Sequence, residues 1–589
     1  MKKLVLFLSL TIAGLHYLSA QNEVLVEAES FISKGGWVVD PQFVEQMGSP
    51  YLMAHGMGAP VLNATTTINL KETGKYHVWV RTKNWVPGNW EAPGRFNVII
   101  NGKVLKNTLG LENDWTWEYA GKTRIKSHKV AIELNDLTGF NGRCDALYFS
   151  KTKEVPTNDT HRLAVWRKTV LGEPTAPEKT ITFDLVITGG GLAGCAAAIA
   201  AAEQGLEVAL IHDRPVLGGN ASEEIRVHTL GIYGKYERIL KMIDTEHYPN
   251  GSYKAKYDQE KRDKNMKSIE NISLFLNWRA YDVLAENNSI QYVDARQTAT
   301  GERIRFEAPL FVDSTGDGWI GFWAGAEFSY GRESVNKYDE EWEKWGELWS
   351  PEVGDNFVMG SSVLWQTEKK QTKQAFPKTP WASDVSGNHA AIAGEWYWEF
   401  SRNDLHQIHD AETIRDHMLR AIYGSFSKAK NDNKNDNIKL DWVSYLIGKR
   451  ESRRLVGDHI FTFKDVRDLT KFKDSVVMEI REVDVHFQQN LKDEDKPDFL
   501  STALFFETPK YYIPYRSLYS KNIANLFMAG RNFSCSHVGL GGPRVMLTTG
   551  QMGAAVGFAS AICKKYSVNP RGVYTEHLEE YMELIEKQQ

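Results

Sequence analysis

Cysteine is scarce in this sequence of 589 residues, which contains only Cys144, Cys195, Cys535 and Cys563. No two of them form a C-x-x-C pair, and their spacing indicates neither a zinc site nor an iron–sulfur cluster. Four widely spaced cysteines also give no basis for a disulfide framework. We therefore expect no metal centre. We interpret Cys195, which lies in an alanine-rich stretch, as a small buried apolar residue.

An excess of charge of one sign is also missing. The chain has 70 Lys and Arg against 75 Asp and Glu, a formal net charge of −5. This balance provides no basic surface for nucleic acid and no polybasic membrane patch. Beyond the N-terminus there is no run of eighteen or more apolar residues, which a membrane-spanning helix needs. The sequence therefore predicts no nucleic-acid partner and no stable membrane insertion.

The first twenty residues have the order of an export signal. Lys2 and Lys3 precede the apolar stretch "LVLFLSLTIAGL", and the small residues "LSA" follow at 18–20. A basic, then apolar, then small-residue order is typical of a secretory signal peptide. We therefore predict that residues 1–20 are a signal peptide, cleaved after Ala20, and that the protein is exported to the periplasm.

Residues 21–152 have the texture of an all-β domain. Short β-rich runs such as "KYHVWVRTK" and "SHKVAIELND" are separated by Gly, Asn and Pro turns. This spacing predicts a β-sandwich. Trp85 and Trp90, in the loop "NWVPGNW", are suited either to stacking on a sugar ring or to sealing the contact with the domain that follows. Residues 153–180 mix Pro, Thr and charge around one brief helical patch, and we interpret them as a linker.

A β-α-β unit follows from residue 181. "FDLVITG" is a buried-strand run, an alanine-rich helix follows, and "EVALIHD" is a second strand. Gly189, Gly191 and Gly194 lie between strand and helix at G-x-G-x-x-G spacing. The first glycine permits a tight turn, the second a close approach to a pyrophosphate, and the third close packing of helix on strand. The N–H groups at the helix start attract phosphate. The pattern predicts a dinucleotide site.

The residue expected to bind the ribose is unusual. An acid normally ends the second strand of such a unit, about 20 residues after the glycines. Here His212 occupies that position and Asp213 follows it. An imidazole nitrogen can also form a ribose hydrogen bond. The alternatives are that Asp213 makes the contact after a one-residue shift, or that His212 is a surface residue. We favour Asp213 slightly.

Five motifs in this order resemble the FAD-dependent oxidoreductase family of the glutathione-reductase-like superfamily. The resemblance covers about 180–565. It rests on "DLVITGGGLAGCAAAIAAAEQG", "RPVLGGNASEEIRV", "FVDSTGDGWIGFWAGAEFSYGRE", "GKRESRRLVGDHIFTF" and "IPYRSLYSKNIANLFMAGRNFSCSHVGLGGPRVMLTTGQMGAAVG".

The resemblance implies an α/β fold whose main part is an FAD-binding Rossmann-like domain of glutathione-reductase type. That domain would span 181–566, with an inserted substrate or cap region at about 329–515. Residues 567–589 would form a C-terminal helix. The preceding all-β sandwich resembles, more loosely, carbohydrate-binding-module and golvesin-like domains.

The resemblance implies FAD as the cofactor and assigns further binding positions. In chain order these are Gly218, Gly219, Asn220, Thr315, Gly316, Asp317, Gly530 and Arg531. The first three are expected near the pyrophosphate and flavin, the next three over the nucleotide, and the last two beside the ribityl chain and flavin. The alternative for Asp317 and Arg531 is an ion pair that stabilises a turn.

Candidate catalytic residues lie in the loop "SCSHVGLGGPR" after Gly530. Oxidation of a C–H carbon by hydride transfer needs a base for the hydroxyl proton and often a cation for developing charge. We interpret His537 as the base and Arg544 as the electrostatic or anchoring group. The alternative is a buried structural histidine and an arginine that ties loops together.

Two other groups are weaker candidates. Arg450, Arg453 and Arg454 either bind an acidic substrate or form a salt-bridged helix face. Asp484 and His486 form a second acid–imidazole pair.

The function indicated by these features is an exported FAD-dependent oxidoreductase. Only one dinucleotide fingerprint is present, which favours reduction of the flavin by the substrate itself. We expect a carbohydrate-like or related hydroxylated substrate, with the electron acceptor unknown. The alternatives are a flavoprotein desaturase or reductase of an organic acid, and a glycan-binding scaffold with vestigial redox activity.

Overall fold

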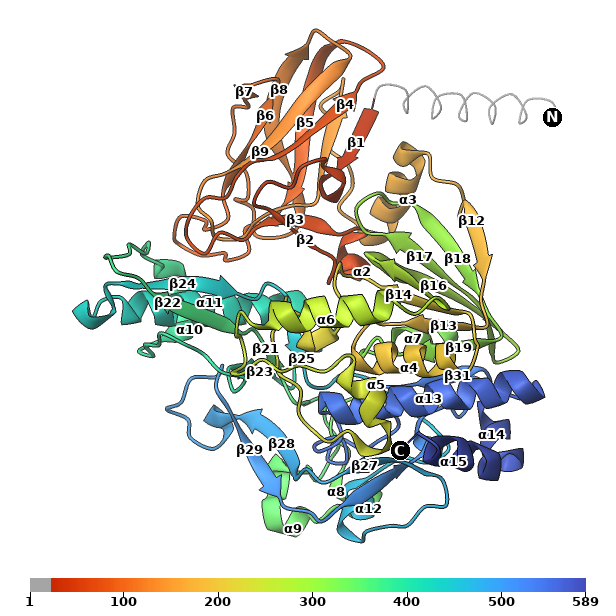
Figure 1. Ribbon diagram of the computed structural model, residues 1–589. Helices are drawn as coiled ribbons and strands as arrows, with labels where there is room; N and C mark the ends of the chain where they lie inside the picture. The colour runs from red at the N-terminus through yellow and green to blue at the C-terminus, as the bar shows by residue number, and fades with distance from the viewer. Residues whose placement is uncertain (1–22, 589) are drawn as a thin grey trace, which may run out of the picture. The chain divides into compact units, whose positions relative to one another are not determined.

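The computed structural model describes residues 23–588, so the expected signal peptide lies outside the described residues. The chain divides into two compact units (Figure 1). Unit 1 comprises Met1–Ala176, Thr298–Gly301 and Ala375–Trp381. Unit 2 comprises Pro177–Gln297, Glu302–Gln374 and Ala382–Gln589.

Unit 1 is built from antiparallel sheets around one hydrophobic core. The strand orders are β1-β11-β5-β8, β4-β9-β6-β7 and β10-β3-β2. Apolar side chains alternate with polar ones, as in β9, and this is the pattern of strands buried on one face. The strands are β1 (Glu23–Glu27), β2 (Val38–Asp40), β3 (Tyr51–Ala54), β4 (Ala64–Asn69), β5 (Gly74–Thr82), β6 (Phe96–Ile100), β7 (Lys103–Val104), β8 (Thr116–Ile125), β9 (Lys129–Asp136), β10 (Gly142–Cys144) and β11 (Ala146–Ser150).

Trp85 and Trp90 both pack inside unit 1. The indole N–H of Trp85 donates to the carbonyl of Phe140 at 2.9 Å, and its ring makes an edge contact with Trp381. The indole N–H of Trp90 donates to the carbonyl of Val86 at 2.9 Å. Trp85 is buried. Trp85 is therefore not an open platform for a sugar ring, and these contacts of Trp85 lie within unit 1.

Helix α3 (Thr160–Leu171) lies within the expected linker but packs on the sandwich. Leu163 and Trp166 join an aromatic cluster with Trp117 and Tyr148. The Arg167 guanidinium donates to Asp145 and, at 2.6 Å, to Ser49. Because this arginine and its carboxylate partner are both buried, the structure places the end of unit 1 at Ala176 instead of residue 152.

The buried pair between Arg167 and Asp145 gives a prediction about stability. Arg167→Gln in the full-length protein should lower the free energy of unfolding of unit 1 by about 1.5–3 kcal/mol, because Asp145 keeps Arg81 as a partner at 2.8 Å but loses a buried, charge-assisted hydrogen bond. Chemical unfolding followed by tryptophan fluorescence measures the change. Arg162→Gln, on the exposed face of the same helix, is the control and should change it by no more than about 0.5 kcal/mol. Equal losses in both variants would contradict this account.

Unit 2 is organised around a five-stranded parallel sheet of order β15-β14-β13-β19-β31. Its central strands are entirely buried, which is typical of a parallel sheet covered on both faces. The strands are β13 (Leu185–Thr188), β14 (Val208–His212), β15 (Ile272–Leu276), β19 (Leu310–Asp313) and β31 (Leu526–Met528). Because the strands are parallel, the loops after β13, β14, β19 and β31 meet at one edge of the sheet.

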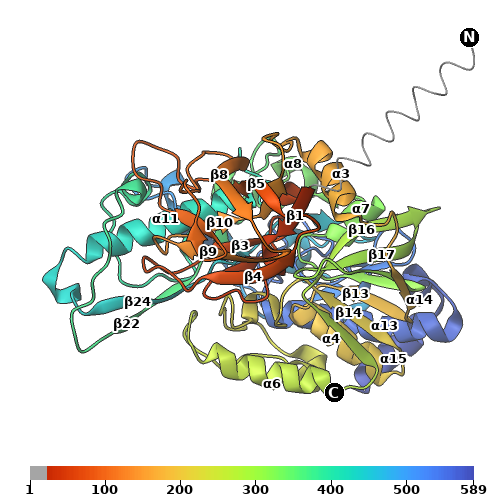
Figure 2. The same cartoon turned by 90° about the horizontal axis from the view of Figure 1, so that it is seen from above.

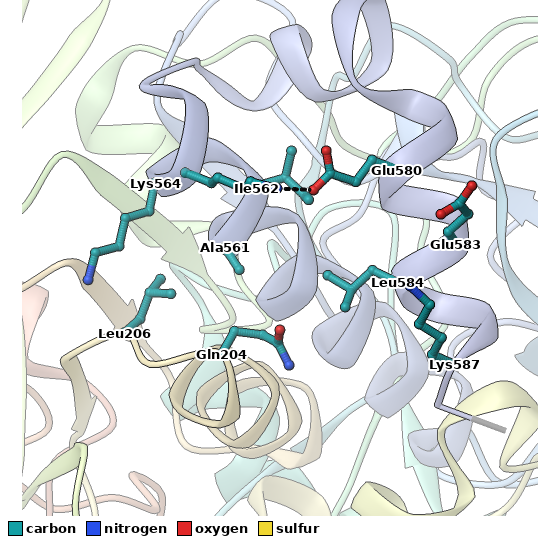
Figure 3. A pocket seen from close by; sticks show the side chains of 10 residues that line it. Gln204, Leu206, Ala561, Ile562, Lys564, Glu580, Glu583, Leu584 and Lys587 are labelled. Carbon is teal, nitrogen blue, oxygen red and sulfur yellow. Dashed lines mark hydrogen bonds and ion pairs between the residues drawn. The ribbon is translucent and has the colours of Figure 1, made fainter.

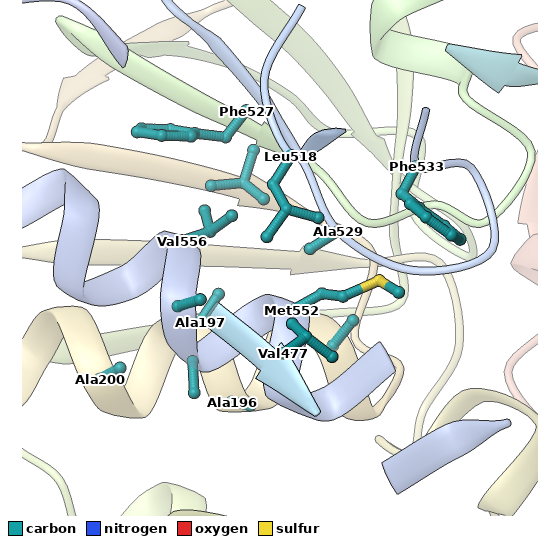
Figure 4. Close-up of a cluster of buried hydrophobic side chains, with 14 of the residues drawn as sticks. Ala196, Ala197, Ala200, Val477, Leu518, Phe527, Ala529, Phe533, Met552 and Val556 are labelled. Carbon is teal, nitrogen blue, oxygen red and sulfur yellow. The ribbon is translucent and has the colours of Figure 1, made fainter. Parts of the chain in front are cut away.

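Two small-residue helices pack tightly against each other, and the first of them packs against this sheet. Helices α4 (Leu192–Glu203) and α13 (Met546–Tyr566) lie side by side in both views (Figures 1 and 2). A Cβ atom on Gly553 would fall 1.9 Å from the carbonyl oxygen of Ala193, so this close approach requires glycine. Figure 4 shows Ala196, Ala197 and Ala200 of α4 near Met552 and Val556 of α13.

Helix α13 owes its apolar character to this core position. Among residues 23–588 it is the one helix long and apolar enough to cross a membrane, and most of that window is buried inside the protein.

A second sheet and several two- and three-stranded sheets complete unit 2. The second sheet has the order β12-β18-β17-β16, and the expected cap region holds the pairs β22-β24, β27-β30 and β28-β29 and the sheet β23-β21-β25. Helix α11 (Ala411–Ala429) is the longest cap helix. The strands are β12 (Lys179–Thr182), β16 (Trp278–Glu286), β17 (Ser289–Gln297), β18 (Arg303–Glu307), β21 (Ser361–Ser362), β22 (Trp365–Lys369), β23 (Glu399–Phe400), β24 (Ile438–Val443), β25 (Gly448–Lys449), β27 (Ser475–Glu479), β28 (Val483–Gln488), β29 (Ser501–Phe506) and β30 (Tyr511–Pro514).

The C-terminal segment forms two helices where one was expected. Helix α14 (Pro570–Glu576) starts with Asn569 as its cap and a proline in the first turn. Helix α15 (Leu578–Glu586) follows after His577, whose φ of −130° is not helical.

Candidate functional site

Two of the three fingerprint glycines are required by protein packing. Gly189 has a φ of +109°, and a Cβ there would lie 2.2 Å from the carbonyl oxygen of Ser314. A Cβ on Gly194 would lie 1.8 Å from the carbonyl oxygen of Gly189. These glycines therefore form the tight turn and allow α4 to pack against it, as the spacing predicts.

Gly191 is a glycine for a different reason. Its φ of −69° suits any residue, and among the described residues the nearest atom to an added Cβ is 4.0 Å away, on Gly219. Gly191 is also the N-cap of α4, which has no acidic residue in its first turn. The open space therefore lies where backbone N–H groups point outward and attract phosphate. This cradle, which a side chain would fill, fits the pyrophosphate of a dinucleotide.

The loop 218–220 lies against this cradle. The amide of Gly218 donates to the carbonyl of Gly190 at 2.7 Å, and a Cβ on Gly219 would lie 3.1 Å from the Cα of Gly191. Asn220 donates from Nδ2 to the carbonyl of Lys449 at 3.1 Å. The structure therefore brings the predicted binding residues of loop 218–220 next to the fingerprint glycines.

His212 and Asp213 have different environments. Only 6 % of His212 is exposed, its Nδ1 accepts the Gly190 amide at 3.1 Å, and its Nε2 lies 3.1 Å from the Val216 carbonyl. Burial, together with Arg214, lowers the pKa of His212 to about 4, so the ring is neutral at pH 7. Asp213 is 33 % exposed and accepts from Arg279 at 3.0 Å. His212 therefore holds the glycine loop in shape, while Asp213 is the more accessible of the two.

Asp317 joins the loops that follow β19 and β31. It accepts from Arg531 and from Lys449, each at 2.6 Å, and from Ser452 at 2.8 Å. Burial alone would raise the pKa of Asp317, but Lys449 and Arg531 outweigh it and hold that pKa well below its ordinary value. The arrangement agrees with the ion pair considered for Asp317 and Arg531.

The neighbouring residues fit the same junction. Gly316 has a φ of +76°, which favours glycine, and a Cβ there would lie 2.3 Å from Nη1 of Arg531. Thr315 holds its own turn by donating to Asp313 at 2.7 Å. A Cβ on Gly530 would lie 3.9 Å from the Cβ of Ala193, so Gly530 is close to the first turn of α4.

Residues 449–454, here called the clasp segment, connect these loops to the cap. Lys449 and Ser452 bind Asp317, while Arg450 donates to Ser362 at 2.7 Å and lies 3.2 Å from Glu399. Arg454 donates to Glu333 at 2.8 Å and to Glu451.

The guanidinium groups of the clasp segment are engaged by the protein itself. Arg453 lies over the ring of Phe322 and donates to the Asp317 carbonyl. Of the two interpretations of the three arginines, the structure therefore favours salt bridges over substrate binding, although the segment is not helical. Lys449, Glu451 and Ser452 were not predicted as site residues, although they lie in the motif "GKRESRRLVGDHIFTF".

His537 is held by two glutamates. It is 1 % exposed, its Nδ1 lies 2.8 Å from Oε2 of Glu451, and its amide donates to Glu333 at 2.9 Å. The other ring nitrogen, Nε2, is buried and has no hydrogen-bond partner within the described part of the chain. Because a carboxylate only accepts, Nδ1 carries the proton and Nε2 carries the lone pair of the neutral ring.

Arg544 is paired with a second histidine centre. It donates to Asp484 at 2.8 Å, and Asp484 also accepts from Arg481 at 2.8 Å. Nε2 of His486 lies 3.5 Å from Asp484, and its Nδ1 lies 2.8 Å from Glu399. The structure therefore connects Arg544 directly with Asp484 and not with His537.

The two histidine centres are neighbours. Glu451 accepts the amide of Met359 at 2.9 Å, and Glu399 accepts the next amide, Gly360, at 2.5 Å. Adjacent Cα atoms are about 3.8 Å apart, so the two carboxylates are within about 10 Å of each other.

A groove elsewhere in unit 2 is not this site. It has a volume of about 530 Å³ and is lined by residues such as Gln204, Ile562, Lys564 and Glu580 (Figure 3). Gln204 follows the C-terminal end of α4, and Gly191 precedes its start, about 20 Å away along the helix axis.

A parallel sheet with a glycine turn that opens at a helix start defines a dinucleotide-binding α/β protein. The sequence profile of the FAD dependent oxidoreductase family matches residues 184–582, and the chain belongs to this family. Its cofactor is FAD, and it is an oxidoreductase. Comparison with curated protein sequences gives no significant match.

Solved structures similar to this chain have low identity. A geranylgeranyl bacteriochlorophyll reductase-like protein from Thermoplasma acidophilum is 12 % identical, with a TM-score of 0.29, over 69 % of this chain and 84 % of that chain. The quinol fumarate reductase of E. coli is 14 % identical, with a TM-score of 0.27, over 67 % of this chain and 72 % of that chain. A family 35 carbohydrate binding module from Clostridium thermocellum is 19 % identical, with a TM-score of 0.18, over 22 % of this chain and 96 % of that chain.

The cradle at Gly191 can be tested by filling it. Gly191→Ala should reduce FAD affinity at least tenfold and leave the melting temperature of the FAD-free protein unchanged, because the methyl group meets no protein atom. Gly194→Ala should destabilise the FAD-free protein itself. Absorbance at 450 nm per chain and thermal unfolding measure the two effects. Normal FAD content in Gly191→Ala would contradict the assignment.

The buried, neutral His212 predicts acid sensitivity. The unfolded chain protonates this histidine below about pH 6.5, whereas the folded chain resists protonation down to about pH 4. Its contribution to stability is therefore complete above pH 6.5 and is lost as the pH falls from 6.5 to 4. His212→Gln keeps an acceptor and a donor but does not titrate. As the pH falls from 6.5 to 4, the free energy of unfolding in urea should decrease by about 2–3 kcal/mol more in the wild type than in this variant. If the free energy of unfolding depends on pH in the same way in the wild type and in His212→Gln, the buried neutral state of His212 does not contribute to acid sensitivity.

Proposed function

We propose that the protein is exported and oxidises a hydroxylated, carbohydrate-like substrate by hydride transfer to FAD. The family supports the redox chemistry. The basic, apolar and small-residue order of the first twenty residues supports export to the periplasm. The single dinucleotide fingerprint supports a substrate, and not a nicotinamide, as the reductant of the flavin. The sheet-rich unit 1 is consistent with a glycan-related role.

One observation carries the proposed chemistry: a buried histidine whose Nδ1 is held by Glu451 and whose Nε2 has no partner among the described residues. Nε2 takes the hydroxyl proton of the substrate while the carbinol C–H bond breaks and the C–O bond becomes a carbonyl. FAD, when bound, accepts the hydride. Glu451 holds the productive tautomer and stabilises the imidazolium that forms.

Reduction or desaturation of an organic acid is the second candidate function. It is favoured by one observation, the two arginines that bind Asp484 beside His486. Under either function, electrons pass between the substrate and the flavin. A scaffold without redox activity would show no such electron transfer.

Anaerobic mixing of the FAD-loaded protein with a panel of glycosides, polyols and uronic acids tests the proposal through loss of flavin absorbance. Once a reductant is found, His537→Gln should slow flavin reduction about 10²–10⁴-fold and leave FAD content unchanged, because the proton acceptor is lost.

His247→Gln is the matched control for this variant. His247 is also buried, with Nδ1 2.6 Å from the carboxylate of Asp258, so the variant breaks the same kind of contact without touching His537 or Glu451. It should affect stability but not flavin reduction. Normal reduction kinetics in His537→Gln would remove this residue from the chemistry, and loss of FAD would assign it a structural role.

A further inference from the structure

Arg481 and Arg544 enclose one carboxylate from both sides. Arg544 donates to Oδ1 of Asp484 and Arg481 donates to Oδ2, each at 2.8 Å. Arg481 also lies 3.8 Å from Glu482 at the surface. A guanidinium has five N–H groups, so two of them around one carboxylate have more donors than Asp484 can accept.

Two of these surplus donors, Nε of Arg481 and Nε of Arg544, are buried and lack an acceptor among residues 23–588. The same holds for the hydroxyl of Tyr511. The Tyr511 hydroxyl lies under the loop that leads to Arg544, since a Cβ on Gly542 would be 2.2 Å from it. Buried donors without acceptors are costly, and native proteins rarely keep several in one cluster unless a ligand completes them.

The nearby acidic groups do not use these donors. Glu479 accepts from the amides of Ile480 and Arg481 and from the Thr548 hydroxyl. Glu399 accepts from Gly360 and Ser501 and pairs with Arg450. The acceptor that the cluster lacks therefore comes from outside the chain.

One side chain of the cluster, Arg481, reaches the surface, and the cluster is close to the proposed reaction centre. Arg481 keeps 23 % of its side chain exposed, and Arg544 keeps 9 %. The second histidine centre, to which Asp484 belongs, adjoins the His537 centre through Met359 and Gly360. Arg544 also lies two residues before α13, whose Gly553 contacts Ala193 in the first turn of α4. The helical part of this separation, from Met546 to Gly553, spans about 10 Å, so the arginine pair lies near the helix whose start forms the cradle.

We propose that Arg481, Arg544 and Tyr511 bind a carboxylate of the substrate, so that the substrate class is an acidic sugar such as a uronic acid. This inference rests on the proposed function and narrows its substrate. A carboxylate supplies two coplanar acceptor oxygens, which match the edge of a guanidinium formed by Nε and one Nη. The arginines of the clasp segment are not candidates for this role because at most 2 % of each is exposed.

Binding to the full-length, FAD-loaded protein tests the proposal. Isothermal titration with D-glucuronate, D-galacturonate and D-mannuronate should show that at least one binds ten times more tightly than its neutral sugar. Arg544→Gln and Arg481→Gln should each weaken that binding at least tenfold, and Arg544→Lys should restore only part of it because lysine lacks the planar edge. Arg402→Gln, at an exposed pair in the cap, should bind normally.

Folding of each variant is checked by FAD content and melting temperature. Asp484 keeps one arginine in either single variant, so both should fold. Equal binding of uronic acids and neutral sugars would overturn the proposal, as would normal binding by both arginine variants. Inorganic sulfate should compete more weakly than the uronate, and equal competition would overturn the carboxylate assignment.

The same titrations separate this proposal from the proposed function. A uronate that binds through the arginines but does not bleach the flavin supports the site and contradicts the proposed oxidation. Bleaching of the flavin by neutral sugars, without binding of any uronate, supports the proposed oxidation and contradicts the carboxylate site.

Discussion

The hydrogen bonds of Asp317 are the interaction on which the rest of the site depends. This one carboxylate joins the loop after β19 to Arg531 after β31 and to Lys449 and Ser452 of the clasp segment. The same segment carries Glu451, which holds His537. A nucleotide-binding edge and a candidate proton acceptor are therefore parts of one buried network, and a change in Asp317 would displace both.

The network also explains a division of roles among similar residues. The clasp-segment arginines face protein acceptors and hold the cap to the sheet edge. Arg481 and Arg544 share one acceptor and retain donors for a ligand. The fingerprint glycines divide in the same way, since Gly189 and Gly194 are required by packing, whereas Gly191 leaves open space. In each case, the contacts of a residue show whether it is required by the fold or is available to a ligand.

Local features of this protein could be predicted from the sequence, and long-range partners could not. The glycine turn was predictable because its strand, turn and helix are contiguous. His537 was named, but its partners Glu451 and Glu333 lie 86 and 204 residues away, beyond any spacing rule. Helix α3 was assigned to a linker because its sequence is polar. Its attachment depends on one buried arginine that meets Asp145, and periodicity does not reveal this contact.

The central claim is that the open cradle at Gly191 binds FAD as the redox cofactor of this protein. The most direct measurement is the amount of FAD released when the purified protein is denatured by heat or acid. The account predicts close to one free FAD per chain in the supernatant, because the contacts of the cradle are non-covalent. A colourless protein that does not take up added FAD would contradict it.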